Sequence, residues 1–391
     1  MRVIRRLRPH SVVGATLLSV AAIAAVAAPA SAAQTHDVSA AAGHVYLNDN
    51  TAGTNTIAAF DRHADGSLTP LAESPFNAGG AGSGAGLASQ GAIQTAGDGR
   101  YELAVDAGSN EVSVLRIAGD GSLDPVPGGV VSSGGVDPVS IAVHGGLVYV
   151  ANAGAVAPNL TGFQLTGDGH LIRLSHGTVG LPANSQPGDV LFNPTGTKLV
   201  ATLVNSSQIA SYSVGNDSRL HAAAGSPFPA QGVGPFGSEF SPTHPDQLFV
   251  SNAHNGAGLG TVSAYDDGHD GTLFSIGSSP FADQQTAPCW VAITSDGRYL
   301  FAVNTGSGSV SRYAIADDGQ LALLGSTPVS ANGGVGAVDP GLSPDGRTLY
   351  VNESKLAAVG VFAVHDGNLT EEPGSPVPLP TGATAAGISV N

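Results

Sequence analysis

Four acidic residues stand near the start of short apolar runs, where a carboxyl group could do proton chemistry. They are Asp137, Asp189, Glu239 and Asp339. A carboxyl group held against water or a substrate can act as a general acid or base. The same residue types also cap the starts of strands and turns, which is the more frequent role. We treat Glu239 and Asp189 as the acid/base candidates, and Asp137 and Asp339 as binding candidates.

Two aromatic residues and one histidine complete the set of candidate binding residues: Phe236, Trp290 and His254. Trp290 follows Cys289, the single cysteine of the chain. A thiol beside a large ring could be a nucleophile, but no histidine is placed to activate it, so we favour a packing role. The other histidines fall on turns or outer strands. The sequence therefore predicts no metal site and no cofactor.

A short acidic run, Asp266 to Asp270, contains several groups that bind cations. It lacks the spacing and the closing glutamate of a helix-loop-helix calcium loop. We interpret it as a tight turn.

The elements that must position these residues are visible as an internal repeat. An Asp-Gly-x-Leu turn, degenerate in one copy, recurs seven times, and its leucines are 48 to 55 residues apart. A second marker, an apolar run that ends in Asn or Asp, recurs in phase with the first. The leucines are Leu68, Leu123, Leu171, Leu220, Leu273, Leu321 and Leu369, and the run-end residues are Asn48, Asp106, Asn152, Asn205, Asn252, Asn304 and Asn352.

Each repeat is expected to form four antiparallel strands, which we name A to D from first to last. In the clearest copy they span Pro288–Thr294, Arg298–Asn304, Ser309–Ile315 and Gln320–Ser326. Asp-Gly pairs suit tight hairpins because they tolerate positive φ. Four-stranded units at this period indicate an all-β, seven-bladed β-propeller.

The two ends of the repeat region are out of step by one strand. The first copy begins at Gly43 with strand B, and Thr384–Val390 resembles a lone strand A. We therefore expect the two ends to share one blade, which closes the ring and removes an exposed edge. The propeller should span residues 43–391.

Propeller geometry places the candidate residues on one face. The A strands line the central channel, and the D–A and B–C connections share the top face. Residues that open the A strands should surround the channel mouth, where a pocket is the default site. The glycine-rich stretch Asn77–Gln90 is expected to be a flexible D–A loop over this mouth, with a lid as the alternative.

The N-terminus resembles an export signal. Four arginines precede an apolar run, and Ala30-Ser31-Ala32 fits a cleavage site, so we expect residues 1–32 to be removed and 33–42 to be flexible. The Arg5-Arg6 pair leaves a twin-arginine route open. The remaining chain has ten basic and thirty acidic residues. This charge disfavours nucleic acid and anionic membranes, and we expect a secreted monomer without a membrane span.

The stretches SPDGRTLYVNES at Ser343–Ser354 and TSDGRYLFAVNTGSGSVSRY at Thr294–Tyr313 resemble the secreted lactonase-like β-propellers, relatives of 6-phosphogluconolactonase and carboxy-muconate cyclase. The resemblance covers about residues 43–391. It implies a lactonase-like carboxylic-ester hydrolase or a muconate-type cycloisomerase. Active relatives carry Arg and His in a G-P-R-H frame; here Phe236 and Gly237 stand at those positions.

Two functions are consistent with these residues. The first is hydrolysis or formation of a lactone ring at the channel mouth. The second is a non-catalytic extracellular binding or scaffold protein that lacks the family's His/Arg cluster. A small-molecule or carbohydrate-derived ligand fits both, but a phosphosugar lactone would need cations, and the chain has two lysines, Lys198 and Lys355.

Overall fold

The structure of the protein is a computed structural model that describes residues 41–329 and 336–391. The expected signal peptide, 1–32, and residues 33–40 of the expected flexible segment lie outside the described residues. The described part consists of β-strands joined by turns and loops. None of its segments is a helix long and apolar enough to cross a membrane.

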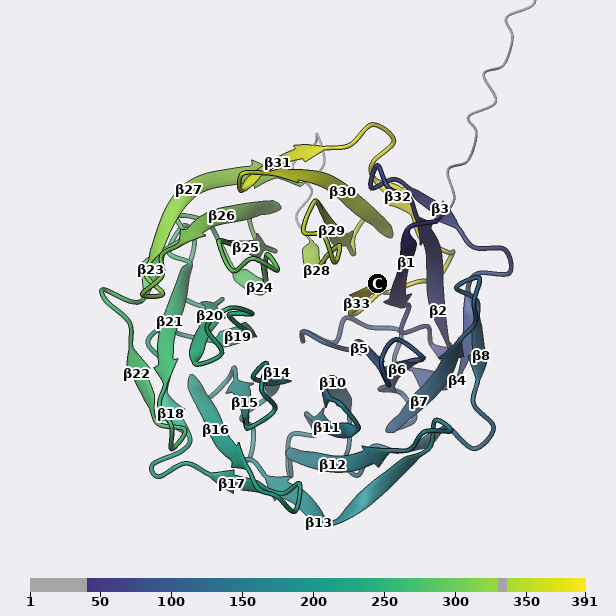
Figure 1. Ribbon diagram of the computed structural model, residues 1–391, viewed down its shortest axis with the longest axis horizontal. Helices are drawn as coiled ribbons and strands as arrows, with labels where there is room; N and C mark the ends of the chain where they lie inside the picture. The colour runs from purple at the N-terminus through teal and green to yellow at the C-terminus, as the bar shows by residue number, and fades with distance from the viewer. Residues whose placement is uncertain (1–40, 330–335) are drawn as a thin grey trace, which may run out of the picture. The chain divides into compact units, whose positions relative to one another are not determined.

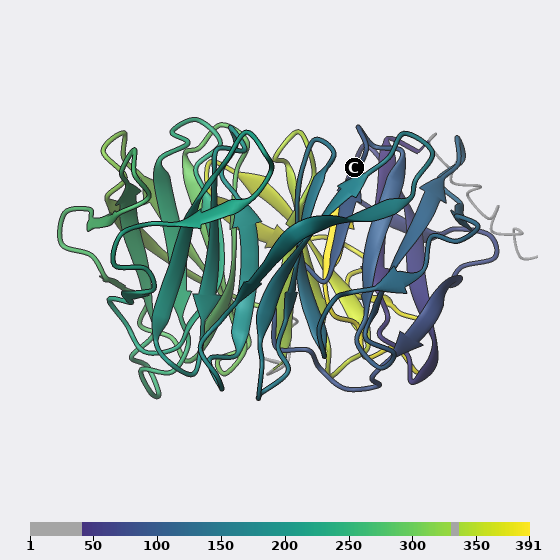
Figure 2. The same cartoon turned by 90° about the horizontal axis from the view of Figure 1, so that it is seen from below.

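Within the unit that spans Ser39–Asn391, seven antiparallel sheets are arranged radially around a central axis (Figure 1). This confirms the seven-bladed β-propeller. Seen from the side, the loops gather on two opposite faces (Figure 2). We number the blades in chain order and call the shared first-and-last blade blade 7.

The strands follow the A-to-D order from the axis outward. The A strands of blades 1 to 7 are β5 (Ile93–Ala96), β10 (Pro138–His144), β14 (Pro187–Phe192), β19 (Pro235–Phe240), β24 (Pro288–Ile293), β28 (Ala337–Leu342) and β33 (Ile388–Val390). The B strands are β6 (Tyr101–Asp106), β11 (Leu147–Asn152), β15 (Lys198–Leu203), β20 (Gln247–Asn252), β25 (Tyr299–Asn304), β29 (Thr348–Glu353) and β1 (Gly43–Asn48).

The C strands are β7 (Glu111–Ile117), β12 (Asn159–Leu165), β16 (Gln208–Val214), β21 (Thr261–Asp267), β26 (Ser309–Ile315), β30 (Ala358–His365) and β2 (Gly53–Arg62). Two D strands are continuous, β13 (Leu171–Gly180) and β27 (Leu321–Pro328). The other five are split into β8 (Leu123–Pro125) with β9 (Val131–Ser132), β17 (Leu220–Ala222) with β18 (Phe228–Pro229), β22 (Leu273–Ser275) with β23 (Phe281–Ala282), β31 (Asn368–Glu371) with β32 (Val377–Pro378), and β3 (Leu68–Pro70) with β4 (Phe76–Gly82).

The ring closes in blade 7, as the sequence predicts. The C-terminal β33 pairs antiparallel with the N-terminal β1, with Val45 opposite Val390 and Leu47 opposite Ile388. Beyond the strand, the main chain of Asn391 donates to the His44 carbonyl at 3.0 Å. The two ends of the described chain are therefore held in one sheet.

Neighbouring blades are joined by tyrosines of the B strands. The Tyr46 hydroxyl donates to the Gly121 carbonyl at 2.9 Å, and the Tyr101 hydroxyl donates to the Gly167 carbonyl at 3.0 Å. Each acceptor lies in the C–D turn of the next blade. Gly121 has a φ of 81°, and a Cβ there would lie 2.2 Å from the His44 ring. The Asp-Gly marker thus serves both the hairpin and the contact between blades.

Candidate functional site

The A strands are bulged near their starts, and the bulges bring five residues to equivalent places around the channel. In each of these strands the pairing with the neighbouring B strand shifts register between the first paired residue and the next one. A bulge re-aims the side chains beside it. The residues at these equivalent places are Ser140, Asp189, Gly237, Trp290 and Asp339.

Asp189 joins three blades. Its Oδ2 accepts from the Ser238 main-chain nitrogen at 2.9 Å and from Ser238 Oγ at 2.8 Å, and its Oδ1 accepts from Ser140 Oγ at 3.2 Å. The side chain is buried. Burial raises the pKa of Asp189 to about 7, although these hydrogen bonds oppose the rise. Most of its acceptor capacity is therefore used within the protein.

Asp339 is buried and only partly satisfied. It is 3% exposed, and its Oδ2 has no hydrogen-bond partner within the described residues. Burial, with the nearby Asp189 and Glu239 carboxyls, holds the pKa of Asp339 well above its usual range; a hydrogen bond from the Gly91 main chain partly offsets this. Asp339 also lines a pocket, so a buried carboxyl with an unused acceptor stands beside a space that could hold a ligand.

The sequence predicts Glu239 near the start of an A strand, at the channel mouth, but the residue lies deeper in the channel. It is half-buried near the far end of β19, opposite Phe249 of β20. Burial, followed by the charge of Asp189, raises the pKa of Glu239 to about 8. The carboxyls of Glu239, Asp189 and Asp339 therefore interact with one another, and we call these three residues the channel carboxyls.

The loop between β4 and β5 enters the channel and closes it. Figure 1 shows the segment before β5 reaching into the middle of the ring. The Gln90 main-chain nitrogen donates to the Gly188 carbonyl at 2.8 Å, and its Nε2 donates to the Ser238 and Val291 carbonyls, each at 3.2 Å. Its Oε1 accepts from the Val291 nitrogen at 3.0 Å. Gln90 thus connects blades 3, 4 and 5 across the axis. We call the loop between β4 and β5, residues 83–92, the plug.

The plug divides the space in the channel. Above it lies the upper pocket, about 360 Å³, and below it lie two cavities of about 230 and 210 Å³. Glu239 lines both lower cavities, whereas Asp339 lines the upper pocket and one lower cavity. The residues of the upper pocket are Gly86, Leu87, Ala88, Ser89, Trp290, Val338, Asp339, Ser354, Thr384, Ala385, Ala386 and Gly387.

The aromatic candidates have different environments. The rings of Phe236 and Trp290 are both buried and meet edge to face, with centroids 5.0 Å apart. Trp290 Nε1 donates to the Ser89 carbonyl at 2.8 Å, which fixes the plug. Trp290 lines the upper pocket, whereas Phe236 does not. Burial raises the pKa of the Cys289 thiol to about 11, so it is a poor nucleophile at neutral pH.

The two remaining candidates lie outside the upper pocket. Asp137 precedes β10 with a φ of 57°, is half-buried, and has a pKa raised by that burial. His254 is exposed in a B–C loop, and its main-chain nitrogen bonds the Val233 carbonyl at 3.0 Å. Neither residue lines the pocket.

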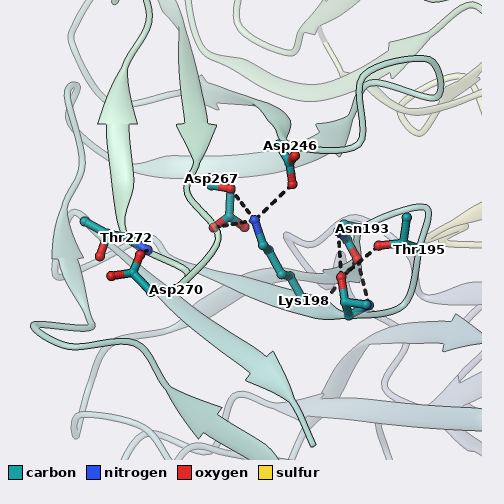
Figure 3. A network of polar contacts seen from close by, with 8 residues as sticks. Asn193, Thr195, Lys198, Asp246, Asp267, Asp270 and Thr272 are labelled. Atoms are coloured by element: carbon teal, nitrogen blue, oxygen red, sulfur yellow. Dashed lines mark hydrogen bonds and ion pairs between the residues drawn. The ribbon is translucent and has the colours of Figure 1, made fainter.

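A second polar cluster lies between blades 3 and 4, around Lys198 (Figure 3). Lys198 Nζ is 3.0 Å from Asp246 Oδ1 and 3.5 Å from Asp267 Oδ1, and it also donates to the Asp267 carbonyl. Asp267 ends β21, and a tight turn follows, closed by a bond from the Gly268 nitrogen to the Thr272 carbonyl at 2.9 Å. The predicted turn is therefore confirmed for the second part of the acidic run, whereas Asp266 and Asp267 are the last residues of β21. The buried carboxylate of Asp267 is paired with Lys198.

The fold and the channel define a seven-bladed β-propeller with a pocket on its axis. Residues 240–383 match the family model described as "Lactonase, 7-bladed beta-propeller". The resemblance seen in the sequence is thereby confirmed, although the match covers the C-terminal part of the chain. No curated protein matches the sequence.

Solved structures with the same fold include the following two. A candidate 6-phosphogluconolactonase from Bacteroides uniformis is 19% identical with a TM-score of 0.70, and covers 89% of this chain and 99% of its own. The periplasmic gluconolactonase PpgL of Pseudomonas aeruginosa is 18% identical with a TM-score of 0.67, and covers 89% and 98%. At this identity the likeness establishes the fold and leaves the chemistry to the residues.

Sequence reasoning expected Asn77–Gln90 to be a flexible D–A loop over the channel mouth, with a lid as the alternative. In the structure Asn77–Gly82 belong to β4, and Ser89 and Gln90 are hydrogen-bonded inside the channel. The plug and the apolar wall of the pocket were therefore not predicted.

The leucines Leu68 and Leu123 are 55 residues apart, the widest interval of the repeat. The loop that forms the plug lies in that interval. The spacing could have indicated an insertion, but its path into the channel depends on contacts with blades far away in the sequence.

Proposed function

We propose that this protein is a lactonase-type hydrolase whose substrate occupies the upper pocket and whose catalytic base is Asp339. The observation that carries the proposal is the set of three channel carboxyls, Glu239, Asp189 and Asp339. Three interacting carboxyls have raised pKa values, and one of them, Asp339, lines a pocket and has an oxygen without a partner among the described residues. Raised pKa values near neutrality are typical of acid–base sites.

The proposal moves the catalytic role from Glu239 and Asp189 to Asp339. Asp189 already accepts three hydrogen bonds, and Glu239 lies below the plug. Both would act through Asp339, because negative charge on either carboxyl raises the pKa of Asp339 and makes its carboxylate a stronger base.

The reaction requires one proton relay. The ionised Asp339 takes a proton from water while the water oxygen bonds to the lactone carbonyl carbon. As the bond from that carbon to the ring oxygen breaks, Asp339 returns the proton to the ring oxygen. The product is the open hydroxy acid, and Asp339 is again ionised.

The test is hydrolysis of a panel of lactones and aryl esters by the wild type, Asp339→Asn and Asp124→Asn, the last being an exposed control on β8. Asp339→Asn should lose about 10²- to 10⁴-fold in kcat/KM, and the control should lose nothing. Wild-type kcat/KM should rise with pH, since only the ionised Asp339 is active. Absence of turnover on the whole panel in folded protein would refute the proposal.

A second candidate function is ligand binding without turnover. The observation that favours it is that the described residues lining the upper pocket include neither lysine nor arginine, the cations that would stabilise a developing oxyanion. In that case a ligand would bind and remain unchanged after prolonged incubation.

The N-terminal arginines and the A-x-A site support an extracellular location. We expect the secreted form to begin near Ala33. Mass spectrometry of the culture medium would test this, and an intracellular protein that keeps residues 1–32 would contradict it.

A further inference from the structure

The upper pocket has an apolar wall and few polar groups. Leu87, Trp290, Val338, Ala385 and Ala386 supply hydrocarbon surface from the plug and from blades 5, 6 and 7. Its volume of about 360 Å³ is at the small end of the range for ligand sites. A compact ligand of mainly apolar surface fits such a lining.

The hydroxyl groups of the pocket are already engaged. Ser354 Oγ donates to the Gly336 carbonyl at 2.8 Å, and Ser89 Oγ donates to the Val139 carbonyl at 2.7 Å. Thr384 Oγ1 donates to the Asn50 carbonyl at 3.2 Å. A sugar ring has several hydroxyls, and in this pocket most of them would lose water without gaining partners, so each one buried there adds a free-energy cost to binding.

Among the described residues that line the pocket, Asp339 is the one with an ionisable side chain. Its Oδ2 has no partner among the described residues, although a buried oxygen of this kind normally has one. In its protonated form this carboxyl can donate to a carbonyl oxygen, and in its ionised form it can accept from water. Both roles suit a ligand with a single ester group on an otherwise apolar body.

We propose that the substrate of the upper pocket is an uncharged lactone with an alkyl substituent, its ester at Asp339 and its hydrocarbon against Leu87, Trp290 and Val338. This inference rests on the proposed function of the same site. It separates this protein by substrate class from propellers that act on sugar lactones. Phosphorylated lactones are disfavoured further, because none of the described residues that line the pocket is basic.

The single tryptophan of the chain makes binding measurable without catalysis. Trp290 lines the pocket, so its fluorescence reports on occupancy. We choose 2-hexylcyclopentanone as a probe that keeps the ring, carbonyl and alkyl chain but cannot be hydrolysed. Glucono-δ-lactam is the matched hydroxylated probe. The ketone should give a saturable change with at least tenfold tighter binding than the lactam.

Two substitutions test the apolar wall. Leu87→Ser lies on a half-exposed loop position, and Val338→Thr keeps the shape of the side chain, so both should fold. Each should weaken ketone binding several-fold. Leu259→Ser, at a 62% exposed position outside the pocket, is the control and should bind as the wild type does.

The outcomes separate this inference from the proposed function. Ketone binding that the pocket variants weaken, without turnover of any lactone, supports the pocket assignment and refutes hydrolysis. Turnover of sugar lactones, with equal or tighter binding of the lactam, overturns the alkyl-lactone inference and leaves hydrolysis in place. No saturable response to the ketone also overturns the inference.

Discussion

Glu102 lies fully buried on β6, and its two hydrogen bonds come from neutral hydroxyls. Thr95 Oγ1 and Ser389 Oγ donate to its Oε1 at 2.5 and 3.2 Å, and its Oε2 has no partner within the described residues. Burial raises the pKa of Glu102 to about 8. The same cause acts on Asp189 and Asp339. At the scale of residues, the propeller holds protons that an unfolded chain would release at neutral pH.

This predicts a pH dependence of stability that Glu102→Gln should reduce. A carboxyl whose folded pKa lies above its unfolded value stabilises the fold below the unfolded pKa, near 4.5, and this contribution is lost as pH rises through about 8. Between these two pKa values, the variant should reduce the pH slope of the unfolding free energy by up to about 1.4 kcal/mol per pH unit. Urea unfolding at pH 5 to 9 measures it, with exposed Glu73→Gln as the control. Equal slopes in wild type and variant would contradict the raised pKa.

At the scale of elements, the plug and the β19 bulge depend on each other. A Cβ at Gly237 would lie 2.2 Å from Gln90 Oε1 and 2.8 Å from the Cys289 carbonyl oxygen, so the plug and β24 together require a glycine at this point of β19. Gln90 in turn uses its amide to satisfy main-chain groups of β19 and β24. The glycine that stands in the family's His position is therefore explained by packing.

A double-mutant cycle tests this dependence. Gln90→Ala should cost about 2 to 3 kcal/mol, because main-chain groups in the channel lose their partners. Gly237→Ala should be destabilising alone and less so in the Gln90→Ala background, because the clash with Oε1 is gone. Gln94→Ala, in the lower cavities, is the control. Additive free energies of unfolding would mean that the two positions are independent.

The strand pattern was largely predictable, because period-2 alternation and Asp-Gly turns are local signals. The four strands expected between Pro288 and Ser326 are found with ends shifted by one or two residues. The marker Asn205 is an exception, since β15 ends at Leu203. Five of the outer strands are split, a detail that the repeat pattern did not indicate.

The candidate site was predictable in part, because periodicity places a residue on a strand but not at a depth. Asp189 and Asp339 do lie on the channel, and the phase of the repeat was enough to put them there. The depth of Glu239 depends on a bulge in β19, and the division of the channel depends on Gln90. Both are tertiary features, formed between segments far apart in the sequence.

At the scale of the whole molecule, ring closure rests on a short strand and a few contacts around it. Three residues of β33 pair with β1, and the Thr384 and Ala386 nitrogens donate to the Asp49 and Asn48 carbonyls at 2.9 and 2.8 Å. Arg62 Nε donates to the Asn391 carbonyl at 3.1 Å. Ser389 also bonds the buried Glu102 of the next blade, so closure involves blade 1 as well as blade 7.

Deletion of residues 384–391 should therefore destabilise the entire propeller. It removes the A strand of blade 7 and exposes β1 as an unpaired edge, which also favours aggregation. We expect the Tm to fall by on the order of 10 °C or more, in a single transition if the blades unfold together. Calorimetry of the deletion variant, compared with a chain extended by eight Gly/Ser residues after Asn391, separates loss of the strand from a general effect at the terminus. An unchanged Tm in the deletion variant would show that the ring is stable without its closing strand, and that blades 1 to 6 supply the stability on their own.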